Sequence, residues 1–228
     1  MKIVTLFVKQ WYEKIVVSLQ RNLKLTKMNI KSIITAAMAL LASTACSGGA
    51  KQEKVMKTEG KAIVVFFSHA GDNYAVGNIE VGNTKIVADY ITELAGADQF
   101  EIVTHKYDGM AYTPLINLAK QETKNSELPE YEGDVDLSQY DTVFIGGPVW
   151  WGTYPQVMFT FFKKHAGDMQ GKTVIPFTTH EGSGLANCVE DVKDAFAGAN
   201  VTKGFSIYGH EVRTEKAKVE KWLKGLGF

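Results

Sequence analysis

The sequence is short of cysteine, of net charge and of long apolar runs, and each shortage excludes a class of protein. Among its 228 residues are only two cysteines, Cys46 and Cys188, too few for a disulfide scaffold or a cysteine-rich zinc or iron–sulfur site. The longest apolar stretch, residues 33–45, is shorter than the ~20 residues that a membrane-spanning helix needs. With 45% hydrophobic and 22% charged residues, most of the chain has the composition of a folded domain.

The charges cancel over the whole chain but are unevenly distributed along it. Residues 1–45 carry seven of the 25 basic residues and one of the 25 acidic residues. Residues 46–228 therefore hold 18 basic and 24 acidic residues, a net charge of −6. This balance argues against nucleic-acid binding, which requires a basic face. The five histidines show no metal-ligand spacing, so we expect no metal site.

Residues 1–45 have the pattern of a leader that is removed. Lys31 precedes an apolar stretch, residues 33–42, and small residues follow before Cys46. A basic start, a short apolar core and small residues at a cut site are typical of a signal peptide. With cysteine directly after the cut, the segment resembles a bacterial lipoprotein signal, which implies that Cys46 carries the lipid. A simply secreted protein, or an apolar helix with a chance cysteine, is the alternative.

The resemblance to a lipoprotein signal implies export and a lipid anchor in the cell envelope, with membrane contact through that anchor only. Residues 46–60, which contain glycine and many charged residues, are predicted to be a flexible tether. Met28 begins a signal peptide of ordinary length, so we expect translation to start there. A long basic leader beginning at Met1 is the alternative.

From residue 61 onward, short apolar runs alternate with helical patterns. The runs predicted to be strands are residues 62–67, 100–103, 142–145, 173–177 and 201–208. The segments predicted to be helices are residues 84–94, 115–124, a helix with Pro155 at its first position, residues 185–196 and a last helix capped by Thr214. This alternation predicts an α/β fold over residues 61–228, a three-layer doubly wound sandwich around a five-stranded parallel sheet. The strand order is either 2-1-3-4-5 or that of half a dinucleotide-binding fold.

Three loops at the carboxyl ends of the predicted strands have unusual compositions, and ligands bind at that edge of such sheets. Residues 68–84 bring glycines, amides and hydroxyls to a helix start, which suits a phosphate, although a plain helix cap is the alternative. Residues 148–155 hold Trp150 and Trp151, which favour a flat aromatic ligand; we expect one of them to pack between helix and sheet. Residues 178–184 offer hydroxyls and backbone groups to the polar edge of a heterocycle.

Together these segments resemble the flavodoxin-like, FMN-binding family. The matching pieces, in the family's order, are Phe66-Phe67-Ser68, Gly82-Asn83-Thr84, Gly147-Pro148-Val149-Trp150-Trp151-Gly152, Pro176-Phe177-Thr178-Thr179-His180 and Gly182-Ser183-Gly184. The resemblance implies strand order 2-1-3-4-5 and FMN as the cofactor. The residues it implies at the FMN phosphate are Ser68, Gly82, Asn83 and Thr84. Those it implies beside the flavin ring are Pro148, Val149, Trp150, Trp151 and Gly152. Those it implies along the far edge of the ring are Thr179, His180, Gly182 and Ser183.

The sequence also departs from the family pattern. Residues 73–81 are inserted into the phosphate loop, and Ala70 replaces a hydroxyl residue. Asp72 would repel a phosphate if its side chain pointed inward. The loop at residues 178–184 contains no aromatic residue comparable to a tryptophan or tyrosine, so we expect the flavin to be covered on one face only.

Bound FMN would make this a redox protein, because the flavin supplies the electron chemistry. One hypothesis is an electron carrier that serves a redox partner protein or a small electron acceptor. A second is an NAD(P)H-dependent or quinone-type reductase, with His180 as a candidate catalytic acid. A third is a lipid-anchored protein of the same fold that has lost flavin binding. Cys188, beside an apolar helix face, is predicted to be a buried thiol without a catalytic role.

Overall fold

The structure is a computed structural model that describes residues 60–228. The predicted signal peptide, the lipid-bearing Cys46 and the tether up to residue 59 lie outside these residues. Within the described part, no helix is both long and apolar enough to cross a membrane.

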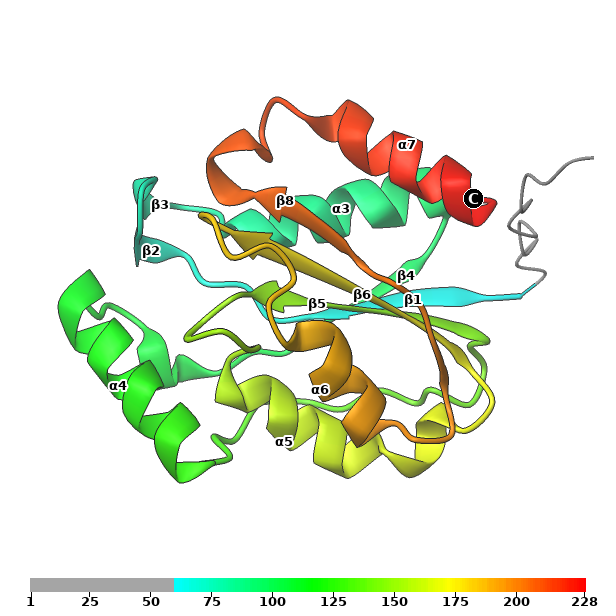
Figure 1. Cartoon of the computed structure of the whole chain (residues 1–228), viewed down its shortest axis with the longest axis horizontal. Helices are drawn as coiled ribbons and strands as arrows, with labels where there is room; N and C mark the ends of the chain where they lie inside the picture. Colours follow the sequence, from blue (N-terminus) through cyan, green and yellow to red (C-terminus); the bar gives the residue numbers. More distant parts are fainter. Residues whose placement is uncertain (1–59) are drawn as a thin grey trace, which may run out of the picture. The chain divides into compact units, whose positions relative to one another are not determined.

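A parallel sheet forms the centre of the domain (Figure 1). Its strands are β1 (Ala62–Phe66), β4 (Asp98–Glu101), β5 (Thr142–Pro148), β6 (Thr173–His180), β7 (Asn200–Val201) and β8 (Phe205–Tyr208). The order is β4-β1-β5-β6-β7, and β8 also pairs with β6. Every pairing in this sheet is parallel. The predicted order 2-1-3-4-5 is thereby confirmed, and the dinucleotide-binding alternative is wrong.

Helices cover both faces of the sheet and make the predicted three layers (Figure 1). They are α3 (Asn83–Ala95), α4 (Tyr112–Asn125), α5 (Gln156–His165), α6 (Cys188–Ala195) and α7 (Lys216–Leu226). Short 3₁₀ turns lie at His105–Tyr107, Gly167–Met169 and Gly209–Glu211. Helices α3 and α7 pack on one face, and α4, α5 and α6 lie on the other. The two apolar clusters that result explain why β1 is buried along its whole length.

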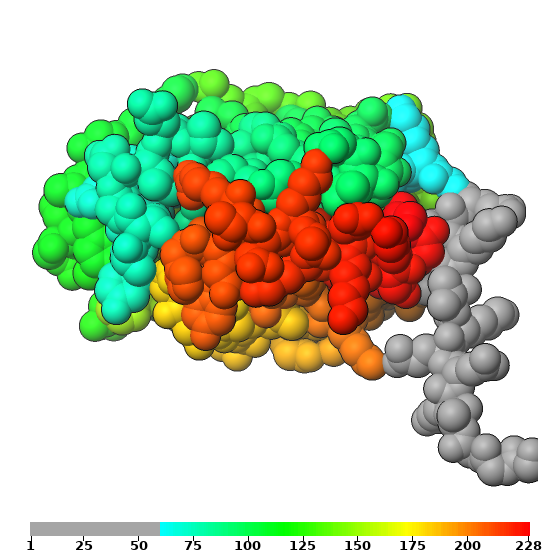
Figure 2. All heavy atoms as spheres, turned by 90° about the horizontal axis from the view of Figure 1, so that it is seen from above, coloured from blue at the N-terminus to red at the C-terminus, as the bar shows by residue number. Residues whose placement is uncertain are grey.

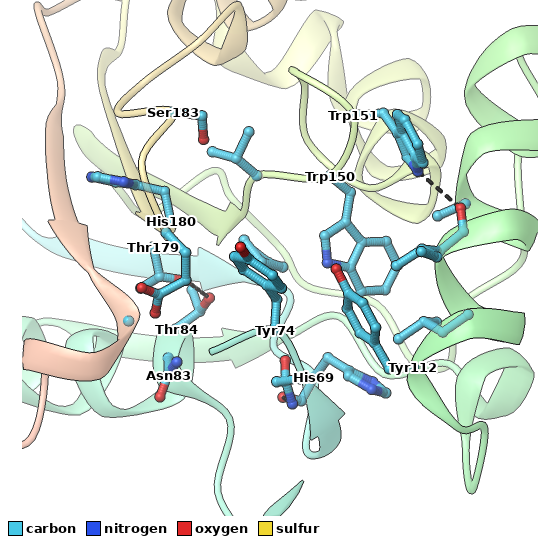
Figure 3. A pocket seen from close by; sticks show the side chains of 18 of the residues that line it. His69, Tyr74, Asn83, Thr84, Tyr112, Trp150, Trp151, Thr179, His180 and Ser183 are labelled. Carbon is cyan, nitrogen blue, oxygen red and sulfur yellow. Dashed lines mark hydrogen bonds between the residues drawn. The ribbon is translucent and has the colours of Figure 1, made fainter. Parts of the chain in front are cut away.

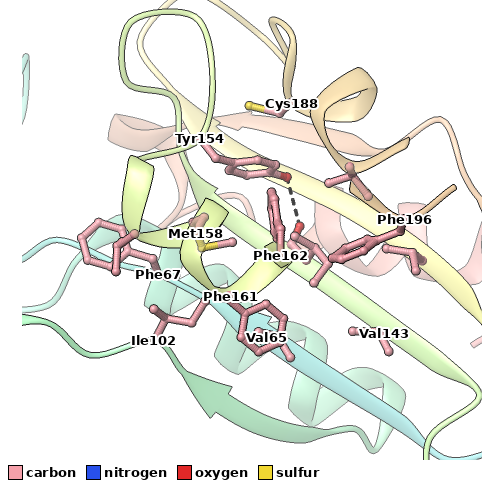
Figure 4. Close-up of a cluster of buried hydrophobic side chains, with 14 of the residues drawn as sticks. Val65, Phe67, Ile102, Val143, Tyr154, Met158, Phe161, Phe162, Cys188 and Phe196 are labelled. Carbon is pink, nitrogen blue, oxygen red and sulfur yellow. Dashed lines mark hydrogen bonds between the residues drawn. The ribbon is translucent and has the colours of Figure 1, made fainter. Parts of the chain in front are cut away.

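The larger cluster lies between β1, β5 and β6 and helices α5 and α6 (Figure 4). Tyr154 is fully buried there, and its hydroxyl reaches the carbonyl oxygens of Ile145 and Phe177, each at 3.1 Å. One side chain therefore joins the carboxyl halves of β5 and β6. On the opposite face, Gly146 leaves room for the ring of Phe177, since a Cβ at Gly146 would lie 1.9 Å from it.

Several predicted element boundaries differ from the structure. Pro155 is the N-cap of α5, and the helix begins one residue later. The expected cap of the last helix by Thr214 is wrong: α7 begins at Lys216, and the Thr214 hydroxyl donates to the carbonyl of Glu211. Helix α6 begins at Cys188 rather than at residue 185, because positive φ angles at Gly184 and Ala186 turn the preceding segment. Gly204, with φ of +78°, divides the predicted fifth strand into β7 and β8.

The insertion at residues 73–81 belongs to a hairpin that the sequence did not reveal. Strands β2 (Gly71–Asn73) and β3 (Gly77–Ile79) pair antiparallel outside the main sheet. The hairpin projects at the end of the domain where α4 begins (Figure 2). Asp72 connects the hairpin to α4, because its Oδ2 accepts a hydrogen bond of 2.9 Å from the backbone N–H of Tyr112. A carboxylate at the first turn of a helix is favourably placed relative to the helix dipole.

Candidate functional site

A cavity of about 370 Å³ opens at the carboxyl ends of β1, β5 and β6 (Figure 3). This volume is within the range of small-molecule sites. The three loops expected to converge do so here, and the β2–β3 hairpin and helix α4 add two further walls. The predicted site residues that line the cavity are Asn83, Thr84, Pro148, Val149, Trp150, Trp151, Thr179, His180 and Ser183. The predicted residues outside this lining are Ser68, Gly82, Gly152 and Gly182.

Ser68 and Gly82 shape one end of the cavity without lining it. The Ser68 Oγ accepts a hydrogen bond of 3.0 Å from the backbone N–H of Lys85 and so holds the first turn of α3. A Cβ at Gly82 would lie 2.2 Å from that Oγ and 2.6 Å from the carbonyl oxygen of His69. Only glycine fits this position, and its absent side chain lets the two loop segments meet at the start of α3.

The first turn of α3 presents donors to the cavity. The N–H groups of Asn83 and Thr84, at the helix start, have no intrahelical partners, and no acidic residue lies in that turn. Thr84 Oγ1 and Thr179 Oγ1 are 2.8 Å apart and buried, so the loop after β6 meets the loop after β1 directly. Free amide donors and the positive end of a helix dipole make this part of the cavity suitable for an anion.

Arg213 is a cation near this end that the sequence did not single out. Its guanidinium donates to the side-chain oxygen of Asn83 at 2.8 Å and to the carbonyl oxygen of Val81 at 2.9 Å. No local motif connects Arg213 to the loop at residues 68–84, so only the fold brings them together.

The loop after β5 forms a tight turn around its two tryptophans. Trp150 and Thr153 exchange backbone hydrogen bonds, and the residues between them, Trp151 and Gly152, have φ angles of +55° and +84°. Positive φ at both central positions is the property of a type I′ turn, and it is unfavourable for a bulky residue such as tryptophan. Gly152 therefore permits the turn rather than lining the cavity.

The two tryptophans have different surroundings. Trp150 packs edge-on against Phe67 and Tyr107, with ring centroids 5.6 Å and 5.2 Å away, and it also lines the cavity. This agrees with the expectation that one of the two would pack into the interior. Trp151 is half exposed; its indole N–H donates to the carbonyl of Ile116, and Lys120 lies over its ring.

Two tyrosines that the sequence analysis did not include among the site residues also line the cavity. Tyr74, at the tip of the β2–β3 hairpin, and Tyr112, at the start of α4, stack with centroids 6.0 Å apart and an angle of 27° between their planes. Figure 3 shows both rings directed into the cavity, close to Trp150. Tyr74 is 62% exposed, so its ring is free to contact a ligand. The tyrosine in the insertion was the sequence signal that could have indicated this wall.

The loop after β6 contributes a histidine and a carboxylate. His180 Nδ1 accepts a hydrogen bond of 2.9 Å from Gly182 N–H, which explains how Gly182 acts on the site from outside the lining. Burial lowers the pKa of His180, and this disfavours the protonated form that a catalytic acid needs. The Glu181 carboxylate accepts from the backbone N–H and Nδ1 of His210, at 2.9 Å and 2.6 Å.

His69 is a second histidine of the cavity, buried beside Trp150 with ring centroids 5.8 Å apart. Its Nε2 has no hydrogen-bond partner in the structure. Buried polar atoms are nearly always paired, so this nitrogen is available to a water or a ligand in the cavity. Burial lowers the pKa of His69, and the attraction of Asp108 and Asp72 offsets only part of this effect. Asp72 lines the cavity, but its carboxylate is held at the start of α4.

One expectation about chemistry outside the cavity can be compared with the structure. Cys188 is fully buried, as predicted, and burial raises the pKa of its thiol, which keeps it protonated. Among residues 60–228, no group of histidine, cysteine or carboxylate side chains is arranged to hold a metal ion.

Comparison with known proteins identifies the family. The family model described as "Flavodoxin" matches residues 61–226, and the chain belongs to this family. No match is found among the curated proteins. A solved candidate flavoprotein from Bacteroides uniformis ATCC 8492 is similar, with 28% identity over 72% of this chain and 98% of that one and a TM-score of 0.58. One from Bacteroides eggerthii DSM 20697 shares 25% identity over 74% and 99% of the two chains, with a TM-score of 0.57.

A third similar structure is a flavoprotein in complex with FMN from Lactobacillus acidophilus NCFM. It shares 21% identity over 72% of this chain and 99% of that chain, with a TM-score of 0.53, and thus supports the fold. The family and these structures together establish a flavodoxin-like flavoprotein fold for residues 61–226.

We predict that Gly82→Ala destabilises the domain by about 1–3 kcal/mol, because the new Cβ forces the backbone of His69 to move. Urea unfolding followed by circular dichroism measures the change. Gly225→Ala is the matched control, since a Cβ at this helical glycine meets nothing within 4 Å. The control should be neutral or stabilising by up to ~1 kcal/mol. Equal effects of the two substitutions would contradict the close packing at Gly82.

We also predict that His69 makes the domain less stable in mild acid. Its lowered pKa means that the folded state binds fewer protons than the unfolded state, so its stabilising contribution is complete above about pH 6.5 and is lost as the pH falls below that value. His69→Gln should therefore flatten the decline of unfolding free energy between about pH 6.5 and 5. In the exposed control His105→Gln, the change has the opposite sign, because hydrogen bonding to Asp108 raises the pKa of His105. An unchanged slope for His69→Gln would refute the prediction.

Proposed function

We propose that this chain is an FMN-binding redox protein that passes electrons to a redox partner protein or a small electron acceptor. The observation that supports this proposal best is a single cavity with a helix start suited to an anion at one end and an aromatic wall at the other. A mononucleotide with an aromatic ring and a phosphate has the same two-ended chemistry. FMN, when bound, supplies the reversible electron uptake that the side chains lack.

The phosphate would be held by the loop after β1. Asn83 and Thr84 line this end and have free backbone N–H groups, while the absent side chain of Gly82 lets the loop pack closely against Ser68 and His69. Ser68 acts there through its hydrogen bond to Lys85 N–H. The inserted hairpin does not place a carboxylate at this end, because Asp72 is bonded to α4.

The flavin ring would lie against the aromatic wall. Trp150 is the aromatic residue best fixed for this role, because Phe67 and Tyr107 pack against its edges. Tyr74 and Tyr112 supply a second aromatic surface from separate elements. The residues that would border the ring are Pro148, Val149, Trp151, Thr179, His180 and Ser183, with Gly152 and Gly182 shaping their loops.

The charges of the cavity favour electron transfer over hydride uptake from NAD(P)H. Asp72 and Glu181 are in its lining, and no lysine or arginine of the described residues is. A dinucleotide carries at least two phosphate charges and would need basic partners beside the flavin. The reductase hypothesis and the hypothesis of lost flavin binding are therefore alternatives that experiment can separate.

We expect the purified full chain to bind FMN, seen as quenching of flavin fluorescence during titration. Trp150→Leu should weaken FMN binding about 2- to 10-fold through the loss of aromatic contact. Tyr90→Phe, in α3 but outside the cavity lining, serves as the control and should bind FMN as the parent does. Absence of binding by the parent protein would establish the third hypothesis. Stopped-flow mixing of the FMN-loaded protein with NADPH should give no rapid bleaching, and rapid bleaching would favour the reductase.

We further propose that Cys46 carries a lipid that anchors the protein in the cell envelope, as its place after an apolar stretch and small residues implies. We expect the protein expressed in a bacterium to sediment with membranes and Cys46→Ser to be released or retained as an uncleaved precursor. Cys188→Ser is the matched control and should still sediment with membranes, because Cys188 is a buried thiol of the folded domain. A Cys46→Ser protein that is processed and sediments like the parent would contradict the proposal.

A further inference from the structure

Arg213 lies far from the phosphate loop in sequence but against it in space. It follows the 3₁₀ turn Gly209–Glu211 and precedes α7. Its Nη1 donates to Asn83 Oδ1 at 2.8 Å, and its Nη2 donates to the carbonyl oxygen of Val81 at 2.9 Å. The guanidinium thus spans the two residues on either side of Gly82, the position that admits no side chain.

The first consequence is the orientation of the Asn83 side chain. A guanidinium can only donate, so the atom it contacts on Asn83 must be the amide oxygen. The amide nitrogen is left as the donor available to a ligand. In Figure 3 this nitrogen lies on the side of Thr84, and the oxygen points away from Thr84 and Thr179. Without Arg213, the amide could turn and present its oxygen, which would repel a phosphate.

The second consequence is a fixed positive charge near the anion-binding end of the cavity. A guanidinium has five N–H donors and stays charged at all ordinary pH values, and the two contacts to Asn83 and Val81 use two donors. Lys85, in the first turn of α3, is paired with Asp89 instead. The nearby Glu181 carboxylate, which binds His210, has the opposite sign. Arg213 therefore opposes a local negative charge that would otherwise disfavour an anion.

We propose that Arg213 is a positioning residue that makes the cavity select the phosphorylated flavin over riboflavin. It orients the Asn83 amide and contributes positive charge where the phosphate would lie. This inference rests on the proposed FMN-binding function. A merely structural Arg213, which only pins the turn at residues 81–83, would affect both flavins equally.

The test measures dissociation constants of FMN and riboflavin for the full chain and its variants. Arg213→Gln should weaken FMN binding about 10- to 100-fold, as expected for a lost charge-assisted interaction, and change riboflavin binding by less than about twofold. Arg213→Lys should restore part of the FMN affinity, because the charge returns without the two-pronged contact. Lys224→Gln is the control for net charge, since Lys224 pairs with Glu220 on α7 and lies outside the cavity lining.

A second variant tests the role of charge by removing a negative group instead of a positive one. Glu181→Gln should tighten FMN binding relative to riboflavin, because it removes the opposing carboxylate. Raising the salt concentration should weaken FMN binding to the parent chain more than to Arg213→Gln.

The outcomes separate this inference from the proposed function. If the parent chain binds FMN and Arg213→Gln leaves the FMN-to-riboflavin ratio unchanged, Arg213 is not a selector and the inference is wrong. The inference is also wrong if both affinities fall together, since this is the signature of a structural role. If the parent chain binds neither flavin, the proposed function itself is wrong and the inference falls with it.

Discussion

The parallel pairing of β1 with β4 on one side and β5 on the other is the constraint on which the rest of the molecule depends. After β1 the chain forms β4 on one side of it, and it later returns to form β5 on the other side. The helices that make these two connections, α3 and α4, therefore lie on opposite faces of the sheet. Neither connecting helix then covers the carboxyl end of β1, and the cavity described above forms there. The loops after β1, β5 and β6 line this cavity, and the first turn of α3 points toward it.

Several residues around the cavity have energetically unfavourable conformations or surroundings that are not found in the interior. Trp151 has a positive φ, His69 has an unpartnered Nε2, and Tyr74 is largely exposed. Each is unfavourable for an isolated domain, and backbone strain and unpaired polar atoms concentrate at sites that meet a ligand. In the interior, by contrast, the hydroxyl of Tyr154 shares its one hydrogen between two carbonyl oxygens. This contrast makes the cavity, rather than the interior, the candidate site of function, and it does not depend on any family resemblance.

The sequence predicted those features that depend on local patterns. The run at residues 62–66 is apolar throughout because β1 is buried on both faces, and composition alone reveals such a strand. The strand order and nine of the 19 residues that line the cavity followed from the strand-and-loop pattern and the family resemblance. The stacking of Tyr74 on Tyr112 and the contact of Arg213 with Asn83 were not predictable, because each joins elements far apart in the chain. The predicted cap at Thr214 is wrong for a local reason, because the hydroxyl donates to the carbonyl of Glu211 in the preceding turn.

The loop that contains the hairpin joins the aromatic wall of the cavity to the start of α3. Residues 71–79 lie within the loop that begins at Ser68 and ends at Gly82, so Tyr74 and the segment that leads into the first turn of α3 belong to one loop. Asp72 fastens this segment to α4, and Arg213 fastens its end to the segment before α7. A displacement of Tyr74 is therefore constrained at both anchors. For this reason the insertion, which departs from the family pattern, adds an aromatic wall to the cavity without disturbing the start of α3.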